Sequence, residues 1–397
     1  MYSSNEQMFI DAGRRDRVAD TSIHSAAAGF RVDHGLPADP ETTNNPTVER
    51  PGPRQAGYEY IRCNLCGADE TETVYEAHHV EDATRDLAHT FRASGDELLV
   101  DRLVRCRACG LQYINPRPMA TAIVEAYSEG DDHAYVSQVS ARERTFAAAV
   151  AHIERLLPGC GRLLDVGTAA GAFLAAARSR EWQVEGCEPN RWLARWGSCH
   201  YGIPIRTGEI FDHHFTPQSF DVVSLWDVIE HTPDPARVIR TAGELIRPGG
   251  LVVVNYPDTG SWIARALGRR WPFLSSVHLY YFTRETMKSL LKRHGFEVVE
   301  MRPHVQRLEL NYLLSRGAVI SGALSNSSRA AARLFGLCHR QVPYWIGQTF
   351  VAARRTRVAQ TFAAGYRALV GLFSFSMSFE EMQELVVTVT VLAQASL

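Results

Sequence analysis

The sequence has almost no net charge, and this limits the partners that it can attract. Its 42 Lys and Arg residues stand against 44 Asp and Glu residues, which gives a formal charge of -2. A chain with this balance has no global field that draws it toward nucleic acid or an anionic membrane. Only a local basic patch could serve such a partner, and composition does not reveal one.

Long uncharged apolar runs are absent as well. Two runs near the C-terminus, ALVGLFSFSMSF and LVVTVTVLAQASL, have 12 and 13 residues, whereas a membrane-spanning helix needs about 18 to 20. The first residues, MYSSNEQMFIDAGRRDR, lack the apolar segment of a secretory signal. We expect no transmembrane segment and a cytoplasmic location. The C-terminal residues pack on the core, dock on a partner subunit, or make peripheral contact with a membrane surface.

Cysteine is scarce, with eight residues, and its spacing argues against a disulfide framework. Four cysteines form two C-x2-C pairs, Cys63 with Cys66 and Cys106 with Cys109, and each pair is followed by glycine. Four thiolates in two such turns make a closed tetrahedral zinc site with no position left for water, so we predict a structural zinc ion. The remaining cysteines are expected to be buried, small apolar side chains; they are Cys160, Cys187, Cys199 and Cys338.

Composition changes along the chain predict five segments. Residues near the N-terminus are rich in Pro, Asn and Thr without apolar periodicity, which is typical of disorder. From residue 162 onward, short apolar runs alternate with helical patterns, which indicates βαβ units and a parallel sheet. The predicted segments are a disordered leader (1–57), a four-cysteine zinc module (58–118), a helical linker (119–160), an α/β domain (161–355) and a C-terminal extension of unknown role (356–397).

A glycine turn follows the first apolar run of the α/β domain. In RLLDVGTAAGAFL, an expected strand that contains Asp165 leads into a turn between Gly167 and Gly171 and then into a helix. Such turns let backbone N–H groups approach a nucleotide-like ligand. The G-x-G-x-x-G spacing of a dinucleotide site is missing. Glu188, at the end of the next expected strand, suits a ribose diol, so these residues fit NAD and S-adenosylmethionine alike.

Four motifs together distinguish the two cofactors. LLDVGTAAG, GCEPN, FDVVSLWDVIEHTPDP and LIRPGGLVVVNYPD resemble, in order and spacing, class I methyltransferases of the ubiquinone-biosynthesis and sugar-modifying type. The resemblance covers residues 160 to 300 or so. It implies a Rossmann-like methyltransferase fold, with a mostly parallel seven-stranded sheet and helices on both faces, beside a small zinc-ribbon-like module. It also implies S-adenosyl-L-methionine as the cofactor.

The resemblance implies roles for the residues of the first two motifs. Asp165, Gly167 and Gly171 match positions that line the methionine end of the cofactor, and Glu188 matches the position that binds the ribose hydroxyls. The chain departs from the family at Ala169, where the usual D-x-G-x-G-x-G pattern has its middle glycine. A small side chain still permits a close approach, although it narrows the backbone conformations available.

Further positions are matched near the third and fourth expected strands. Glu209 and Ile210, in TGEIFD, match the place where the family holds adenine. Asp227 and its neighbour Trp226 match the wall beside the methionine moiety and the transferred methyl group. Trp226 is equally interpretable as a core residue.

Two histidines are candidates for a catalytic base. His231, in the Glu230-His231 pair, follows the fourth expected strand at the edge of the sheet where ligands bind in open α/β folds. A structural role at the start of the next helix is the alternative. His278, in SSVHLYYFTRETM, is the second candidate. The resemblance implies that its segment covers the acceptor pocket; in the alternative, its aromatic residues pack on the sheet and Thr283 caps the following helix.

Three functions remain to be separated. The first is methyl transfer to a small-molecule acceptor, a hydroxyl or carbon of a sugar, glycan precursor or natural-product scaffold. The second is an RNA methyltransferase whose zinc module contacts nucleic acid, but the low charge and the absence of an N-P-P-Y run after the fourth expected strand argue against it. The third is a non-catalytic scaffold with a methyltransferase-like fold. The sequence does not decide the acceptor or the oligomeric state.

Overall fold

The computed structural model describes residues 57–77, 86–95, 97–309 and 341–354. The chain divides into two units, residues 1–52 and 53–397, and every described residue belongs to the second unit. The predicted C-terminal extension and the predicted disordered leader, apart from residue 57, therefore lie outside the described residues.

The apolar runs of the α/β domain form a seven-stranded sheet with the order β12-β13-β10-β9-β6-β7-β8. The pairs β6–β7, β6–β9, β7–β8 and β9–β10 are parallel, whereas β13 runs antiparallel to both of its neighbours. The predicted α/β, mostly parallel fold class is confirmed. The strands are β6 (Arg162–Val166), β7 (Gln183–Glu188), β8 (Ile205–Thr207), β9 (Phe220–Trp226), β10 (Ile246–Tyr256), β12 (Phe296–Glu309) and β13 (Gln341–Arg354).

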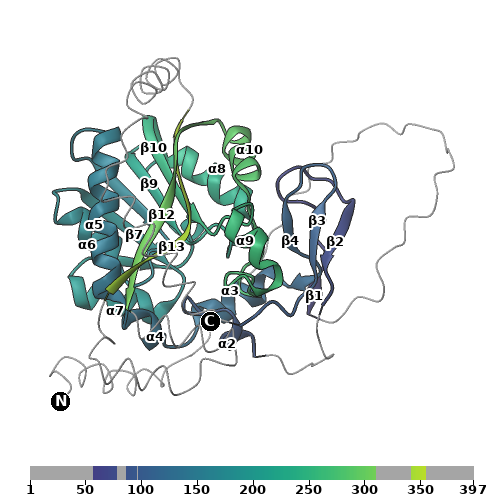
Figure 1. Ribbon diagram of the computed structural model, residues 1–397. Helices are drawn as coiled ribbons and strands as arrows, with labels where there is room; N and C mark the ends of the chain where they lie inside the picture. Colours follow the sequence, from purple (N-terminus) through teal and green to yellow (C-terminus); the bar gives the residue numbers. More distant parts are fainter. Residues whose placement is uncertain (1–56, 78–85, 96, 310–340, 355–397) are drawn as a thin grey trace, which may run out of the picture. The chain divides into compact units, whose positions relative to one another are not determined.

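Helices cover both faces of this sheet because the central strands are apolar on both sides. Alternate residues of β6 show the two faces: Leu163 packs with Phe146 and Phe173 of α5 and α6, and Leu164 packs with Val238 of α8. Figure 1 shows α5 and α6 on one side of the sheet and α8 and α10 on the other. These helices are α5 (Val139–Leu156), α6 (Ala172–Arg178), α7 (Arg191–Tyr201), α8 (Pro235–Leu245) and α10 (Arg284–Arg293).

Side chains cap several of these helices. Asn190 accepts from the backbone N–H of Leu193 at the start of α7, and Asp234 accepts from that of Arg237 at the start of α8. Thr283 caps α10, as in the alternative interpretation of its segment, and its side chain accepts from the N–H of Thr286. Shorter helices are α2 (Leu87–Thr90), α3 (Ala120–Ser128), α4 (His133–Val136), α9 (Trp262–Leu267), η1 (Ile210–Asp212) and η2 (Gly268–Arg270).

The cysteine module has its own antiparallel sheet, with the order β11-β4-β3-β2. Its strands are β2 (Thr71–Tyr75), β3 (Leu103–Cys106), β4 (Gln112–Ile114) and β11 (Tyr280–Tyr281), and a separate pair joins β1 (Tyr58–Glu59) to β5 (Arg117–Pro118). The strand β11 comes from the segment between β10 and α10, so this small sheet is built from two distant parts of the chain. The aromatic residues of β11 are buried in that sheet.

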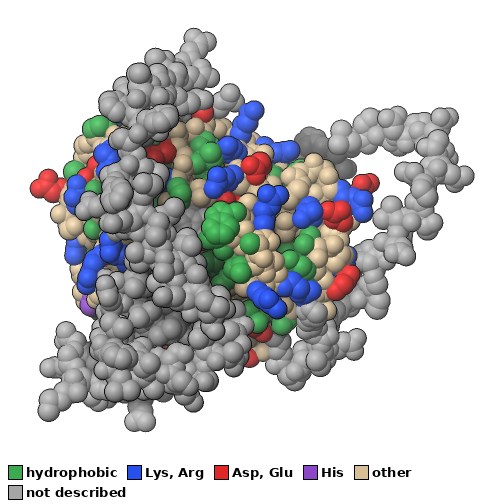
Figure 2. Space-filling view, viewed as in Figure 1, with side chains coloured by type: hydrophobic (Ala, Val, Ile, Leu, Met, Phe, Trp, Pro, Cys, Tyr) green, Lys and Arg blue, Asp and Glu red, His purple; other side chains and the backbone are tan. Residues whose placement is uncertain are grey.

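No described helix is both long enough and apolar enough to cross a bilayer. Figure 2 shows acidic, basic and hydrophobic side chains interspersed on the described part of the face in view. This mixture agrees with the balanced charge of the whole sequence.

Candidate functional site

The turn after β6 uses left-handed backbone conformations at three positions. Gly167, Ala169 and Gly171 have φ angles of 64°, 48° and 80°. At Gly167 glycine is also required by space, since a Cβ atom there would lie 2.7 Å from Val228 Cγ2. At Ala169, the position that departs from the family pattern, alanine adopts the conformation that a glycine would adopt more easily. The alternation folds the turn back over the end of β7.

Two buried carboxyl groups lie beneath this turn. The Asp165 carboxylate accepts from Ser224 Oγ at 2.6 Å, and the Glu188 carboxylate accepts from the backbone N–H groups of Ala169 and Asn190 at 2.7 and 2.8 Å. Burial disfavours the charged forms and raises the pKa of Asp165 to about 7 and that of Glu188 to about 7. Carboxyl groups with a raised pKa are concentrated at functional sites, so these two are candidates for ligand contact.

A cavity of about 150 Å³ opens at the carboxyl ends of β6 and β9. This is the edge of a parallel sheet where ligands bind. Its wall is largely apolar and includes Phe146 and Phe173, and polar groups enter from several loops. Seven of the predicted site residues line it, namely Asp165, Gly167, Glu209, Ile210, Trp226, Asp227 and His231.

Three predicted residues are not among those that line the cavity. Gly171 is the N-cap of α6, and Glu188 is fully buried against the glycine turn. His278 is 8% exposed and lies behind His231, with 4.8 Å between the ring centroids. The structure thus gathers the predicted residues of the cofactor motifs at one sheet edge, in an inner layer around the cavity and an outer layer that supports it.

Trp226 is a core residue that also lines the cavity. Its ring packs against Phe146 and Phe173, with centroid distances of 5.4 and 5.1 Å, and it also lines the cavity. Among the other lining residues, Ile210 is 2% exposed and Glu209 begins η1 as its N-cap. Burial raises the pKa of Glu209.

The loop between β9 and α8 also begins with a left-handed residue. Asp227 has a φ angle of 54°, and its carboxylate accepts from Asn255 Nδ2. Its own backbone N–H donates to the Asn255 carbonyl at 3.2 Å. Burial raises the pKa of Asp227, and the positive charge of Arg142 opposes that shift. Asn255 on β10 thereby fixes both the backbone and the side chain of Asp227.

His231 is held as a neutral imidazole. Its Nδ1 donates to the Val277 carbonyl at 3.1 Å, which leaves Nε2 with a free lone pair. Burial lowers the pKa of His231 to about 4. The two ring nitrogens of His231 thus have different roles: Nδ1 orients the ring, and Nε2 can accept a proton.

Glu230 and His278 complete a buried group around His231. His231 Nε2 lies 4.0 Å from Glu230 Oε1, and His278 Nδ1 donates to the Phe273 carbonyl at 2.7 Å. Among the described residues, neither oxygen of the Glu230 carboxyl has a hydrogen-bond partner, and burial raises its pKa well above the usual range. The ligand atoms of the three residues lie within 4.8 Å of one another, close enough to hold one cation but too far apart for hydrogen bonds between all of them.

Arg142 is a site residue that the sequence reasoning missed. It lies on α5, in the segment predicted as a linker, and it is the one Lys or Arg among the described residues that line the cavity. Its guanidinium stacks 4.1 Å from the centroid of Tyr135. The signal for it was the helical phase: Ala141, Thr145 and Phe146 are the buried face of α5, and Arg142 adjoins that face.

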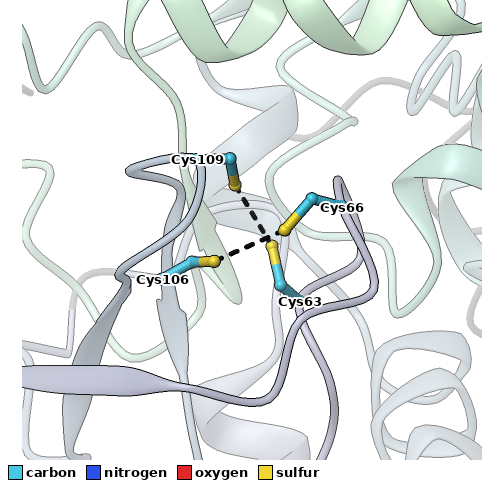
Figure 3. Close-up of side chains that lie close together, drawn as sticks. All are labelled: Cys63, Cys66, Cys106 and Cys109. Atoms are coloured by element: carbon cyan, nitrogen blue, oxygen red, sulfur yellow. Dashed lines mark hydrogen bonds between the residues drawn. The ribbon is translucent and has the colours of Figure 1, made fainter.

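The four predicted cysteine ligands converge at one point (Figure 3). The Sγ atoms of Cys63 and Cys109 are 3.4 Å apart, and those of Cys66 and Cys106 are 3.5 Å apart. Each C-x2-C pair lies in a turn that a backbone hydrogen bond closes. The Gly67 N–H donates to the Cys63 carbonyl, and the Gly110 N–H donates to the Cys106 carbonyl. Four sulfur atoms in this arrangement are the donor set of a tetrahedral, thiophilic metal.

The expectation that the scattered cysteines are buried is wrong for two of them. Cys187 is buried, but Cys160 and Cys199 are exposed. Cys160 follows α5 outside regular structure, and Cys199 lies on the exposed face of α7, where no core requires a small apolar side chain. Cys338 lies outside the described residues.

The match to a known protein family covers the part of the chain that contains the cofactor-motif residues. Residues 139–301 match a family model described as a methyltransferase domain. The ubiquinone biosynthesis O-methyltransferase of Yersinia pestis (strain Pestoides F) is 34% identical over 120 residues, which are 28% of this chain and 49% of that protein. The chain thus spans about half the length of the curated relatives that it matches.

Solved structures of low sequence identity are also similar. A putative methyltransferase of Bacillus halodurans C-125 is 15% identical, with a TM-score of 0.39, and the match covers 53% of this chain and 99% of that one. Phosphoethanolamine N-methyltransferase 2 of Haemonchus contortus, solved in complex with S-adenosyl-L-methionine, is 16% identical, with a TM-score of 0.35 and coverage of 55% and 57%.

Proposed function

We propose that the chain transfers a methyl group from S-adenosylmethionine to a small-molecule acceptor, from the premise that residues 139–301 match a family model described as a methyltransferase domain. The acceptor group in this proposal is a hydroxyl or carbon of a sugar, glycan precursor or natural-product scaffold. The observation that supports it is the convergence of the motif residues on one cavity, whose wall includes the carboxyl groups of Asp165, Glu209 and Asp227 and the neutral imidazole of His231.

The charges around the cavity fit the proposed cofactor. In this proposal Arg142 would bind the carboxylate of the methionine moiety, and Asp227 would face its positive groups, since both residues line the cavity. In the ligand-free protein Glu188 accepts a hydrogen bond from the glycine turn, and in the complex its carboxylate would accept from the ribose hydroxyls. Glu209 and Ile210 would contact the adenine. A cofactor with a positive sulfonium and amine suits a wall that contains several carboxyl groups.

When bound, S-adenosylmethionine supplies a methyl group activated by a positively charged sulfur. The protein's part is to align the acceptor, exclude water and take up its proton. Neutral His231, with Nε2 free, is the proposed base. Glu230 Oε1 lies 4.0 Å from His231 Nε2, and the Glu230 carboxyl stabilises the protonated imidazole when this carboxyl ionises. His278 packs behind the His231 ring.

We propose a structural zinc ion at Cys63, Cys66, Cys106 and Cys109. A site with four protein thiolates leaves no open position for substrate or water, so the metal would stabilise the module of residues 58–118 without taking part in methyl transfer.

A methyl-transfer assay tests the proposed function. Zinc-replete protein is incubated with methyl-labelled S-adenosylmethionine and acceptor panels that contain nucleotide sugars, polyphenols and RNA. The proposal expects label on a sugar or other small molecule, with loss of transfer in His231→Gln. His214→Gln, which changes an exposed histidine, is the control. Label on RNA would favour the alternative acceptor, and no label on any panel would favour a scaffold.

The raised pKa of Glu188 predicts that ligand binding depends on pH. Below pH 7 the carboxyl of the ligand-free protein is largely protonated, whereas the ribose hydroxyls need the ionised form as an acceptor. Binding of S-adenosylhomocysteine should therefore release a proton, and its Kd should be about tenfold lower at pH 8 than at pH 6. Calorimetry in buffers of different ionisation enthalpy measures both quantities. Glu188→Gln should remove this dependence, and a Kd that does not change with pH in the wild-type protein would contradict it.

A further inference from the structure

The loop between β9 and α8 is held in place by residues that lie far away in the sequence. Its residues His231, Thr232 and Pro233 line the cavity, and the loop contains no helix or strand between Trp226 and Pro235. Its first residue, Asp227, is fixed by Asn255 as described above. Its far end needs a second support, because an irregular segment is not fixed at one end alone.

Asn64, which lies inside the first C-x2-C turn, provides part of that support. Its Nδ2 donates to the Asp234 carboxylate at 2.8 Å, and its Oδ1 accepts from the backbone N–H of Ala236 at 2.8 Å. The same oxygen of Asp234 accepts from the N–H of Arg237 at 3.0 Å. Pro235 has no N–H group, so Asn64 and Asp234 together satisfy the first free donors of α8.

Arg117, at the end of the cysteine module, supports Pro233, the residue before Asp234. Its Nη1 donates to the Pro233 carbonyl at 2.9 Å and to Tyr280 Oη at 3.2 Å, and Tyr280 Oη donates to the same carbonyl at 3.1 Å. The Arg117 side chain is buried, and its Nε pairs with Glu59 at 2.9 Å. Buried charge-assisted bonds of this kind are strong and directional.

We propose that Asn64 and Arg117 are positioning residues that hold the loop of residues 227–234 against the cavity, so that the cysteine module controls the shape of the active site. This inference rests on the proposed function for its effect on the cofactor, but the contact itself is independent of any ligand. It gives the cysteine module a role beyond its own stability, because the turn with the proposed metal ligands Cys63 and Cys66 also caps α8, the helix that follows His231.

The Asn64–Asp234 pair allows an exchange experiment. In Asn64→Asp a carboxylate replaces the amide that donates to Asp234, and two negative groups then meet where one hydrogen bond was. In Asn64→Asp combined with Asp234→Asn the amide and the carboxylate change places. Asparagine is as good an N-cap as aspartate, so all three hydrogen bonds can form again. Ala108→Asp adds the same charge to an exposed position of the second cysteine turn and is the control.

Two measurements follow each variant, together with its zinc content. Hydrogen exchange of residues 228–236 should be faster in Asn64→Asp and return to the wild-type rate in the exchanged pair. The Kd for S-adenosylhomocysteine should rise about tenfold in Asn64→Asp and recover to within about twofold in the exchanged pair. Zinc content should be the same in all variants. If Asn64→Asp does not fold, Asn64→Ser removes the bond to Asp234 without adding charge.

The inference is overturned if Asn64→Asp, or its serine substitute, leaves the exchange rates unchanged, or if the exchanged pair is as impaired as the single variant. Equal effects of Ala108→Asp would also overturn it, because charge on the module would then be the cause. A wild-type protein that does not bind S-adenosylhomocysteine refutes the proposed function alone, since the exchange rates still test the contact.

Discussion

Removing the proposed zinc ion from the four-cysteine site is expected to unfold the cysteine module and to abolish cofactor binding. Structural zinc sites contribute on the order of 10 kcal/mol to the folding of small modules. The loss should be severe here because Cys63 and Cys106 are buried in the core, packed with Val104, Leu111 and Tyr113. The contacts of Asn64 and Arg117 with the β9–α8 loop would be lost together with the module.

Cys106→Ser tests this expectation. Purified wild-type protein should contain one zinc ion per chain, and the variant should contain none, melt earlier and show no binding of S-adenosylhomocysteine. Cys199→Ser, which changes an exposed cysteine on α7, is the control and should behave as wild type. A metal-free wild-type protein, or a Cys106→Ser variant with unchanged melting, would refute a structural metal.

Arg142→Ala is expected to weaken S-adenosylhomocysteine binding by about 10- to 100-fold, the range that corresponds to the loss of charge-assisted hydrogen bonds. Arg142 is the one guanidinium among the described residues of the cavity wall, and the ligand's methionine moiety has a carboxylate. Its side chain is also restrained by stacking on Tyr135, so little freedom is lost on binding.

A smaller ligand makes this prediction specific. Methylthioadenosine has the adenine and ribose but no carboxylate, so its Kd should be nearly the same in Arg142→Ala and wild type. Arg142→Lys should recover part of the lost affinity, and Arg144→Ala, two residues further along α5 and exposed, should change nothing. Equal weakening of both ligands by Arg142→Ala would mean that the substitution disturbs the cavity generally and that Arg142 does not bind the carboxylate.

The sheet could be predicted from the sequence because its signals are local. The strands β6 and β9 are apolar runs buried on both faces, and Gly167 and Asp227, which directly follow them, line the cavity. The C-x2-C turns are equally local, since spacing alone brings each cysteine pair together. For that reason Asp165 and Asp227 could be proposed from their motifs, and both line the cavity, while the four cysteines lie together in a separate cluster.

Long-range contacts could not be predicted in the same way. Asn64 meets Asp234 across 170 residues, and β11 pairs with β4 although no pattern in the sequence relates them. The role of Arg142 depends on which face of α5 packs on the sheet, and Ala169 adopts a conformation that its side chain does not favour. Such features depend on tertiary packing, which overrides local preference.

Calorimetric titration of zinc-replete protein with S-adenosylhomocysteine, repeated with Glu188→Ala, tests the central claim most directly. The account predicts one site per chain with a Kd in the micromolar range, a binding free energy of about -8 kcal/mol. The substitution should weaken binding by about 1 to 3 kcal/mol, the cost of losing hydrogen bonds to a charged group. Well-folded wild-type protein that binds no S-adenosylhomocysteine would contradict the claim that this cavity is a cofactor site.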